Sequence, residues 1–548
     1  MNSKQFLSII ISIIFSFELV INEEKTIKIA IIGSGIGGSS TAYWIEKLRN
    51  EKYSDTQLSI TVYEQEKETC GRVRSRDIGE DTMIEAGATI FHVSNKYMVD
   101  FADEFGLAKY RVSQNPHISK SMTKFGFWHE NDFLMQQSSS SLLTKFKIGY
   151  NFGFFDLLKT NRLSEEMKNK FCRIYDLQAQ GISFETTKDL YQTINMFELS
   201  QESLKNYLKN FGLSKMIYDV FASMALRGNI GEQDPGETNA LGGLICLIAE
   251  GKDLYTVNQG NQKICDNLIQ SSKNAILKLN HAVKEIRYQE TTESGNEEKD
   301  PSQKHGEYVL RIQNNEKSGS LETEVYDAVV FAAPFHSDKI KIEIPDFDPK
   351  IYEKEYIPIY STFITGDVNP SYFGKESVPT EIYTTYNSSL QFTTLSLKTI
   401  FKNGTKLFRL FSKTPITQEI LQKLFFNGKI VDEYRHEYPL LKINSSNTPF
   451  RFGSTDSHVY FVNAMEIPFS VMETEAIGGL NVAHLFFKDF FGEKFVFEEQ
   501  HNEVTEEEHT DIFEEKPIEV ISEQPIELTE KKPIEITEEK PEESDKEL

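Results

Sequence analysis

Three glycines near the start of the chain are spaced as in loops that hold the phosphates of a dinucleotide. Gly33, Gly35 and Gly38 form a G-x-G-x-x-G pattern directly after the apolar run 27–32. Gly33 would permit a tight turn, Gly35 would let the backbone approach a pyrophosphate, and Gly38 would let a helix pack closely on the strand. The start of that helix would attract negative charge. The alternative is an ordinary glycine-rich turn.

An acidic residue follows where a ribose would lie. The run 58–63 predicts a second buried strand, and Glu64 comes 26 residues after Gly38. A carboxylate at the end of this strand suits the diol of an unphosphorylated adenosine ribose. Strand, glycines, helix, strand and acid in this order predict a dinucleotide-binding βαβ unit, which FAD and NAD proteins share.

The two segments after this unit distinguish between those cofactors. Residues 70–75 read CGRVRS and residues 84–88 read IEAGA. They resemble the flavoprotein oxidase superfamily that includes amine oxidases, in which a G-G-R segment brings arginine to the cofactor and an E-x-G-A segment passes the flavin. The resemblance implies FAD as the cofactor, with contacts at Arg72 and Gly87. Cys70 replaces the first of the paired glycines.

Later segments supply the remaining parts that a cofactor domain of this superfamily needs. Residues 282–288 and 308–312 alternate as paired strands do, and 326–333 is apolar enough for a buried strand. Residues 458–491 predict a strand, a loop and a helix. The resemblance implies that the Val283 backbone meets adenine and that Glu473 lies in the flavin segment. The alternatives are an ordinary hairpin and a charge at a helix N-terminus.

These segments predict an α/β fold. A Rossmann-type FAD-binding domain of the glutathione-reductase and amine-oxidase kind would be assembled from separated segments, and an α+β substrate domain would fill the gaps between them. Within the substrate parts, helical spacing occurs over 199–224 and strand-like runs over 381–395. The FAD-binding parts would be 26–109, 276–340 and 456–497, and the substrate parts 110–275 and 341–455.

The order and wording of several segments resemble the prenylcysteine oxidase family over roughly residues 27–495. These segments are IAIIGSGIGGSSTAYWIEKL, ITVYEQ, GRVRS, EAGATIFH, LYTVNQGNQKICDNLIQSS and AMEIPFSVMETEAIGGLNVAHLFF. The family's W-x-V-E-G-G-N stretch appears here as YTVNQGN, Tyr255 to Asn261. The resemblance implies an FAD-dependent thioether oxidase that converts S-prenyl-cysteine and O2 into prenyl aldehyde, cysteine and H2O2. A related oxidase acting on an amine or another lipid, and a non-catalytic member, remain alternatives.

The sequence offers no clear catalytic side chain, which fits a cofactor that carries the chemistry. Catalytic residues therefore stay unknown. His92 is the candidate for proton handling, although a structural histidine is the favoured interpretation. The four cysteines, Cys70, Cys172, Cys246 and Cys265, lack metal-ligand spacing, so no metal is expected. One disulfide and four thiols both remain open.

The start of the chain predicts entry into the secretory pathway. Lys4 precedes an apolar run over 6–17, as in a signal peptide of residues 1–21, and no stable membrane span is expected. A retained signal anchor is the alternative. Sequons at Asn387, Asn403 and Asn444 agree with this route. A lysosome or vacuole is the expected location, with the endoplasmic reticulum lumen or secretion as alternatives.

The charge of the chain is concentrated at its end. The net charge is −24, and residues 501–548 hold 18 acidic residues and 5 lysines. This acidity argues against nucleic acid as a partner. Prolines recur every eight residues from Pro517 to Pro541 within this region. Residues 498–548 are therefore expected to be an acidic disordered tail, and the expected partners are the small-molecule substrate and O2.

Overall fold

The computed structural model describes residues 26–492, apart from Asp81, Asp346, Ile467 and the stretches 116–117, 119–122, 249–252, 291–305, 317–320, 444–449 and 454–456. The chain divides into the units 1–495 and 496–548, and all described residues belong to the first. The expected signal peptide and the expected acidic tail lie outside the described residues.

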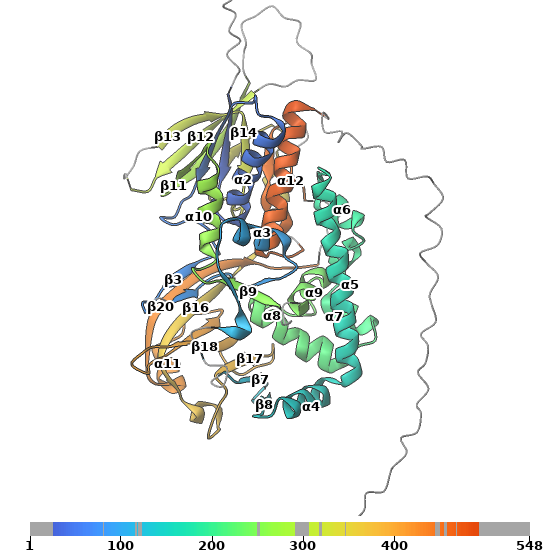
Figure 1. Ribbon diagram of the computed structural model, residues 1–548, viewed down its shortest axis with the longest axis vertical. Coiled ribbons are helices and arrows are strands. Elements are labelled where there is room, and N and C mark those ends of the chain that lie inside the picture. Colours follow the sequence, from blue (N-terminus) through green and yellow to red (C-terminus); the bar gives the residue numbers. More distant parts are fainter. Residues whose placement is uncertain are drawn as a thin grey trace, which may run out of the picture. The chain divides into compact units, whose positions relative to one another are not determined.

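A five-stranded parallel sheet carries the nucleotide-binding motif (Figure 1). Its strand order is β10-β2-β1-β14-β21, so strands from three separated parts of the chain are neighbours, as the predicted fold class requires. The expected strands at 27–32 and 58–63 are confirmed. The strands are β1 (Ile27–Ile32), β2 (Leu58–Tyr63), β10 (Ala275–Lys278), β14 (Ala328–Phe331) and β21 (Val459–Phe461).

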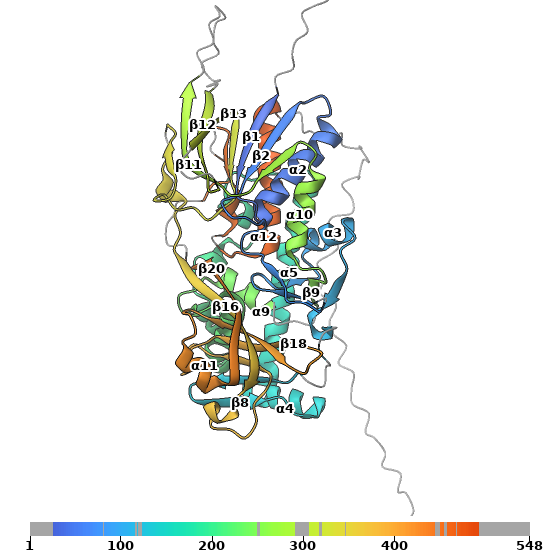
Figure 2. The ribbon, with the colours of Figure 1, turned by 90° about the vertical axis from the view of Figure 1, so that its left-hand side faces the viewer.

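Both faces of this sheet are covered (Figure 2). Ile29 and Ile31 of β1 are buried in one cluster with residues of helices α2 (Ile36–Lys52) and α12 (Met472–Phe491). Ala30, between them, is buried in a second cluster with an antiparallel sheet. This alternation explains why the strand reads as a nearly continuous apolar run. The second sheet comprises β11 (His281–Glu290), β12 (Gly306–Asn314), β13 (Leu321–Tyr326) and β15 (Lys341–Glu343).

The expected pair of strands around 282–288 and 308–312 is confirmed as β11 and β12. The expected strand 326–333 is shorter, because Tyr326 ends β13 of the second sheet and only Ala328–Phe331 joins the parallel sheet. The expected strand 458–464 also ends early, since a 3₁₀ turn over Val462–Glu466 follows Phe461. Short turns thus divide runs that are uniformly apolar in sequence.

The expected substrate parts of the chain form a seven-stranded mixed sheet with the order β20-β16-β19-β18-β17-β7-β8. The expected strand-like region 381–395 contains one short strand, a loop and the start of another, because residues 385–393 reverse the chain. The strands are β7 (Phe125–His129), β8 (Asp132–Gln136), β16 (Tyr356–Val368), β17 (Glu381–Thr384), β18 (Thr394–Ile400), β19 (Lys406–Ser412) and β20 (Phe425–Pro439), with helix α11 (Gln418–Leu424) before β20.

Helices accompany this second sheet (Figure 1). The expected helix over 199–224 is interrupted, because Gly212 has φ = 82° just after α7 and the chain resumes as a π-helix at Met216–Phe221. The helices are α4 (Ser141–Phe152), α5 (Phe154–Ala179), α6 (Thr187–Thr193), α7 (Leu204–Asn210), α8 (Ala222–Ile230) and α9 (Ala240–Ile248).

Short helices and strands over 75–111 and 254–271 position residues of the candidate active site. They are β3 (Ser75–Asp77), β4 (Met83–Glu85), β5 (Phe91–His92), α3 (Lys96–Glu104), β6 (Lys109–Arg111), β9 (Leu254–Val257) and α10 (Gln262–Ser271).

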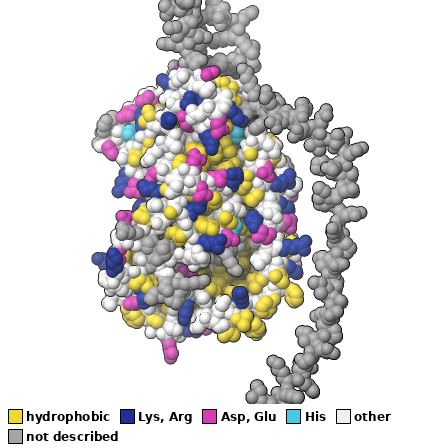
Figure 3. Space-filling model, in the orientation of Figure 1, with side chains coloured by type: hydrophobic (Ala, Val, Ile, Leu, Met, Phe, Trp, Pro, Cys, Tyr) yellow, Lys and Arg dark blue, Asp and Glu magenta, His cyan; other side chains and the backbone are white. Residues whose placement is uncertain are grey.

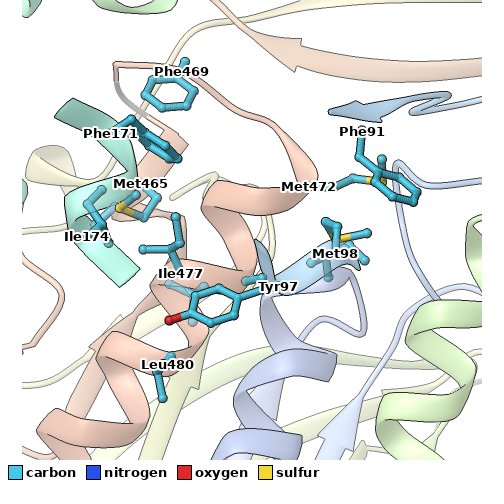
Figure 4. Packing of buried hydrophobic residues seen from close by; sticks show 14 of the residues in the cluster. Phe91, Tyr97, Met98, Phe171, Ile174, Met465, Phe469, Met472, Ile477 and Leu480 are labelled. Carbon is cyan, nitrogen blue, oxygen red and sulfur yellow. The ribbon is translucent and has the colours of Figure 1, made fainter. Parts of the chain in front are cut away.

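Helix α12 is the centre of the largest apolar core. Ile477 and Leu480 of α12 pack among side chains from α3, α5 and the turn before α12, including Tyr97, Ile174 and Met465 (Figure 4). Helix α12 therefore joins the side chains of α3 and α5 into one core. Among the described residues, no helix is both long and apolar enough to cross a membrane.

Candidate active site

The glycine loop between β1 and α2 is tight at two positions and open at the third. Gly33 has φ = 104°, and a Cβ on it would lie 2.6 Å from the carbonyl oxygen of Ala332. A Cβ on Gly38 would lie 1.9 Å from the carbonyl oxygen of Gly33. At Gly35, apart from the adjoining backbone, no heavy atom of the described residues lies within 4 Å of the Cβ position. The loop therefore needs glycine twice for its own packing and leaves room at the start of α2, where a phosphate fits.

Glu64 lies against this loop, directly after β2. Its Oε2 accepts hydrogen bonds from the backbone N–H of Ser34 at 3.1 Å and from the Ser34 hydroxyl at 2.7 Å. The carbonyl oxygen of Glu64 accepts from the N–H of His281 at 2.7 Å, two residues before Val283. The structure thus brings Glu64, the glycine loop and the start of β11 together. The ribose contact of Glu64 and the adenine contact of Val283 stay predictions.

Arg72 is the centre of a buried group of charges that we call the Arg72 cluster, comprising Arg72, Lys354, Tyr356, Glu466 and Glu475. The Arg72 guanidinium forms an ion pair with Glu466, which is fully buried. Glu466 also accepts hydrogen bonds from Lys354 Nζ at 3.2 Å and from the Tyr356 hydroxyl at 3.0 Å. Such a buried carboxylate is stable only because several donors compensate its charge.

The two carboxyl groups of the Arg72 cluster have opposite pKa shifts. Burial by itself would raise the pKa of Glu466, but attraction by Arg72 and Lys354 outweighs burial and lowers it. Burial and repulsion by Glu466 both raise the pKa of Glu475. Glu475 Oε1 is buried with no hydrogen-bond partner among the described residues, and its Oε2 lies 3.2 Å from the Cβ position of Gly37. A protonated carboxyl group beside the glycine loop can donate a hydrogen bond to an anionic group.

Gly87 permits a close crossing of two backbone segments. A Cβ on Gly87 would lie 1.9 Å from the carbonyl oxygen of Arg72, which also accepts from the N–H of Ala88 at 3.0 Å. This glycine is therefore required by the segment that carries Arg72. A direct cofactor contact at Gly87 stays a prediction.

The stretch Tyr255–Asn261, which differs from the W-x-V-E-G-G-N pattern, contacts Ser75 and Glu85 near the Arg72 segment. The N–H of Asn261 donates to Glu85 Oε1 at 2.7 Å, and a Cβ on Gly260 would lie 2.5 Å from Ser75 Oγ. Gly260 and Asn261 are buried, whereas Asn258 and Gln259 are exposed. The retained residues of the pattern thus make the buried contacts, and two of the changed residues face solvent.

Glu473 has a structural task in α12. Its Oε1 accepts from the N–H of Tyr97 at 2.9 Å and the hydroxyl of Tyr175 at 2.8 Å, and its Oε2 accepts from the N–H of Met98 at 2.9 Å. Burial raises the pKa of Glu473 to about 7 against the effect of these donors. The carboxylate therefore satisfies the first turn of α3, which is the alternative that the sequence left open. A cofactor contact of Glu473 stays a prediction that these bonds do not favour.

His92 is tied into the backbone next to it. Its Nδ1 accepts a hydrogen bond from the N–H of Ser94 at 3.1 Å, and burial lowers the pKa of its ring. This is the arrangement of a structural histidine, the interpretation that the sequence favoured.

One face of β20 covers the Arg72 segment with alternate side chains. The Tyr434 hydroxyl donates to the carbonyl oxygen of Gly71 at 2.9 Å, and the Tyr438 hydroxyl donates to that of Ser470. Between them, His436 is kept neutral, because burial and the positive charges of Arg72 and Arg409 lower its pKa to about 4. Its Nδ1 has no partner among the described residues. The alternation of side chains along this strand is visible in the sequence, but the sequence does not show which of the two faces lies on the Arg72 segment. Tyr434, His436 and Tyr438 were therefore not predicted as site residues.

A disulfide joins Cys70 to Cys265 of α10, which lie 195 positions apart in sequence. It resolves the question that cysteine spacing left open and fixes the segment before Arg72. In the described part of the chain, no group of three His, Cys, Asp or Glu side chains is arranged to hold a metal ion.

Known proteins share both the fold and its order of segments. Residues 31–105 match the model of an NAD(P)-binding Rossmann-like domain. A solved variant of putrescine oxidase is 13% identical, with a TM-score of 0.51 over 84% of this chain and 100% of that one. Cyclohexylamine oxidase from Brevibacterium oxydans is 12% identical, with a TM-score of 0.50 over 85% and 99%. The protein thus has the amine-oxidase fold with a Rossmann-type nucleotide-binding domain.

Residues 135–499 match the model of the prenylcysteine lyase family. Prenylcysteine oxidase 1 of Rattus norvegicus is 28% identical over 480 residues, covering 84% of this chain and 88% of the relative. Farnesylcysteine lyase of Arabidopsis thaliana is 26% identical, covering 86% and 90%. The chain therefore belongs to the prenylcysteine lyase family.

Proposed function

We propose that this protein is an FAD-dependent thioether oxidase that cleaves S-prenyl-cysteine. The observation that carries the proposal is the family match over residues 135–499 in a chain that also has an open phosphate loop at Gly35. The reaction converts the thioether, water and O2 into the prenyl aldehyde, cysteine and H2O2. Water provides the aldehyde oxygen, and O2 receives the two electrons.

The residues around the glycine loop fit FAD. Gly35 leaves room for a pyrophosphate, Glu64 lies where a ribose diol would bind, and Glu475 has an unpartnered buried oxygen beside the loop. When bound, FAD supplies the two-electron oxidation at the isoprenoid C1 carbon. Such chemistry needs no protein nucleophile, in agreement with the absence of an obvious one in the sequence.

The Arg72 cluster holds two basic groups in fixed positions. Arg72 and Lys354 both lie against the carboxylate of Glu466, while burial and repulsion by Glu466 raise the pKa of Glu475. Two basic groups therefore face a carboxyl group whose pKa is lowered and one whose pKa is raised. A preorganised positive charge stabilises negative charge that develops during a reaction, because nothing has to rearrange.

The experiment that tests this proposal is anaerobic mixing of the purified yellow protein with farnesylcysteine. The flavin absorption band is expected to bleach, and readmission of O2 is expected to yield one H2O2 per aldehyde. S-methylcysteine is the matched control and should bleach slowly, because it lacks the apolar chain whose burial contributes about 0.8 kcal/mol per CH2. Equal bleaching by a simple amine would instead support an amine oxidase, and a colourless protein would support a non-catalytic member.

We also propose that the protein works in the secretory pathway, with the lysosome or vacuole as its destination. Asn387 and Asn403 of two sequons are exposed, and the disulfide between Cys70 and Cys265 suits an oxidising compartment. The triple variant Asn387→Gln, Asn403→Gln and Asn444→Gln, which removes all three sequons, should lose the mobility shift that a glycosidase produces in the wild type. A wild type with no such shift that fractionates with the cytosol would contradict the proposal.

A further inference from the structure

Large apolar side chains project from the hairpin of α4 and α5. Figure 3 shows hydrophobic atoms gathered at the lower right of the molecule, where Figure 1 labels α4. These side chains are between 53% and 81% exposed. We call them the hairpin patch: Leu142, Leu143, Phe146, Tyr150, Phe154, Phe155 and Leu158.

The hairpin patch is continuous. Its α4 members recur so that they share one side of the helix, while Thr144 and Phe152 of α4 are buried. The ring of Phe146 lies 6.3 Å from that of Tyr150 and 6.2 Å from that of Phe154. Phe154 packs over Gly149, where a Cβ would lie 2.1 Å from its ring. The two helices thus present one surface.

This surface is held in place by the fold. The Ser140 hydroxyl accepts from the N–H of Leu143 at 3.4 Å at the start of α4. Asp156 Oδ2 accepts from the N–H of Ser214 at 3.0 Å, which joins α5 to the segment after α7. The apolar side chains are therefore displayed on ordered helices and do not belong to a loop that could fold them inward.

The charges around the hairpin patch are mostly positive, in a chain with a net charge of −24. Lys145, Lys147, Lys159 and Arg162 are all exposed. The acidic residue among the patch positions 142–158, Asp156, is engaged with the Ser214 backbone, and Glu165 and Glu166 further along α5 pair with Lys168 and Lys170. Leucine and aromatic side chains bordered by lysine and arginine are the composition of helices that lie in the interface of an anionic membrane.

We propose that the hairpin patch docks the protein onto an anionic lipid bilayer, with α4 and the start of α5 lying in the headgroup region. A second copy of the chain fits less well, because a two-fold contact would place the same lysines opposite one another. The contact concerns a surface and not the redox site, so it goes beyond the proposed function. A docked enzyme could receive lipid-tailed substrates directly from the membrane.

The experiment measures binding of the purified full-length protein to vesicles in the absence of substrate. The wild type should sediment with vesicles of phosphatidylcholine and phosphatidylserine, and less with phosphatidylcholine alone or at high salt. The double variant Phe155→Ser with Leu158→Ser should weaken binding by at least about tenfold, since two large side chains no longer leave water. The charge variant Lys145→Glu with Lys159→Glu should lose only the preference for the anionic vesicles.

The matched control is Ile276→Ser with Phe426→Ser, which removes two side chains that are 59% and 52% exposed outside the patch. It should bind vesicles as the wild type does. The proposal is overturned if the patch variant binds equally well, if the wild type does not bind, or if the wild type is a dimer that the patch variant dissociates. Peroxide formation from dissolved farnesylcysteine should be unchanged in the patch variant, so a failed docking result and a failed activity result are distinguishable.

Discussion

The glycine loop and the Arg72 cluster lie next to each other and differ in how they make room for, or surround, a ligand. The loop removes side chains so that the backbone itself can approach a ligand, and the nearest atoms to the Cβ positions of Gly33 and Gly38 are backbone carbonyl oxygens. The Arg72 cluster fills the interior with charged side chains, and its central pair joins residues 394 positions apart. Steric changes should therefore damage the loop, whereas the Arg72 cluster should be sensitive to changes of charge that hardly alter volume.

The largest expected effect is in the Arg72 cluster. Glu466→Gln is nearly isosteric, but it leaves Arg72 and Lys354 buried without their counter-charge. We expect a loss of about 3–5 kcal/mol in the free energy of unfolding, measured by urea denaturation. Glu419→Gln, which breaks the exposed pair with Lys423, is the control and should leave the free energy of unfolding nearly unchanged. Equal losses in the two variants would show that the buried pair contributes no more to the free energy of unfolding than the exposed pair does.

A smaller but still large effect is expected in the glycine loop. Gly38→Ala places a methyl group 1.9 Å from the carbonyl oxygen of Gly33, so α2 must move away from β1. We expect a loss of about 3 kcal/mol in the free energy of unfolding. Gly228→Ala in α8 is the matched helical control, because the nearest atom to its Cβ position is 3.7 Å away. It should be neutral or slightly stabilising. If Gly38→Ala melts at the wild-type temperature, the packing of α2 on β1 is not as tight as described.

Gly35→Val separates ligand binding from folding within the same loop. Residue 35 has φ = −62°, which any residue adopts, and its Cβ position is open, so the variant should unfold within about 0.5 kcal/mol of the cofactor-free wild type. The added side chain fills the space that a pyrophosphate needs, and the purified variant should therefore lack the yellow colour. Retention of full flavin absorbance would place the dinucleotide elsewhere.

The last expected effect concerns the pH dependence of stability. Burial and repulsion by Glu466 raise the pKa of Glu475 to about 8, above its value in the unfolded chain. The folded state therefore binds this proton more tightly, and its contribution to stability is present at low pH and is lost as the pH rises from about 4.5 to about 8. Glu475→Gln cannot ionise, so its stability relative to the wild type should increase across this window. A constant difference between the two proteins from pH 4.5 to pH 8 would contradict this assignment.

Local sequence predicted the nucleotide half well. The spacing of Gly33, Gly35 and Gly38 was sufficient because the strand, the loop and the helix that use them are consecutive in the chain. The disulfide partner of Cys70 could not be chosen, since the spacing of four cysteines does not reveal which pairs the fold brings together.

The Arg72 cluster could not be predicted from local sequence in the same way. Glu466 was overlooked although it stands in a segment that resembled the family, because its role depends on Arg72, Lys354 and Tyr356 from distant segments. Glu473 was selected in the same segment; its carboxylate accepts hydrogen bonds from the start of α3, and its cofactor contact stays a prediction. Which of two nearby glutamates faces a ligand depends on tertiary packing, and periodicity carries no information about it.

The position of Glu466 near the end of the described chain also has a consequence for synthesis. Arg72 leaves the ribosome 394 residues before its counter-ion does, a delay of about 20 to 80 s at ordinary translation speeds. During that time the first βαβ unit lacks β14 and β21, the strands that extend its sheet beyond β1, and it lacks α12, which covers one face. The nucleotide-binding half therefore completes its folding only after α12, which ends at Phe491, has been synthesised, and until then its growing chain exposes an unpaired strand edge to chaperones and to aggregation.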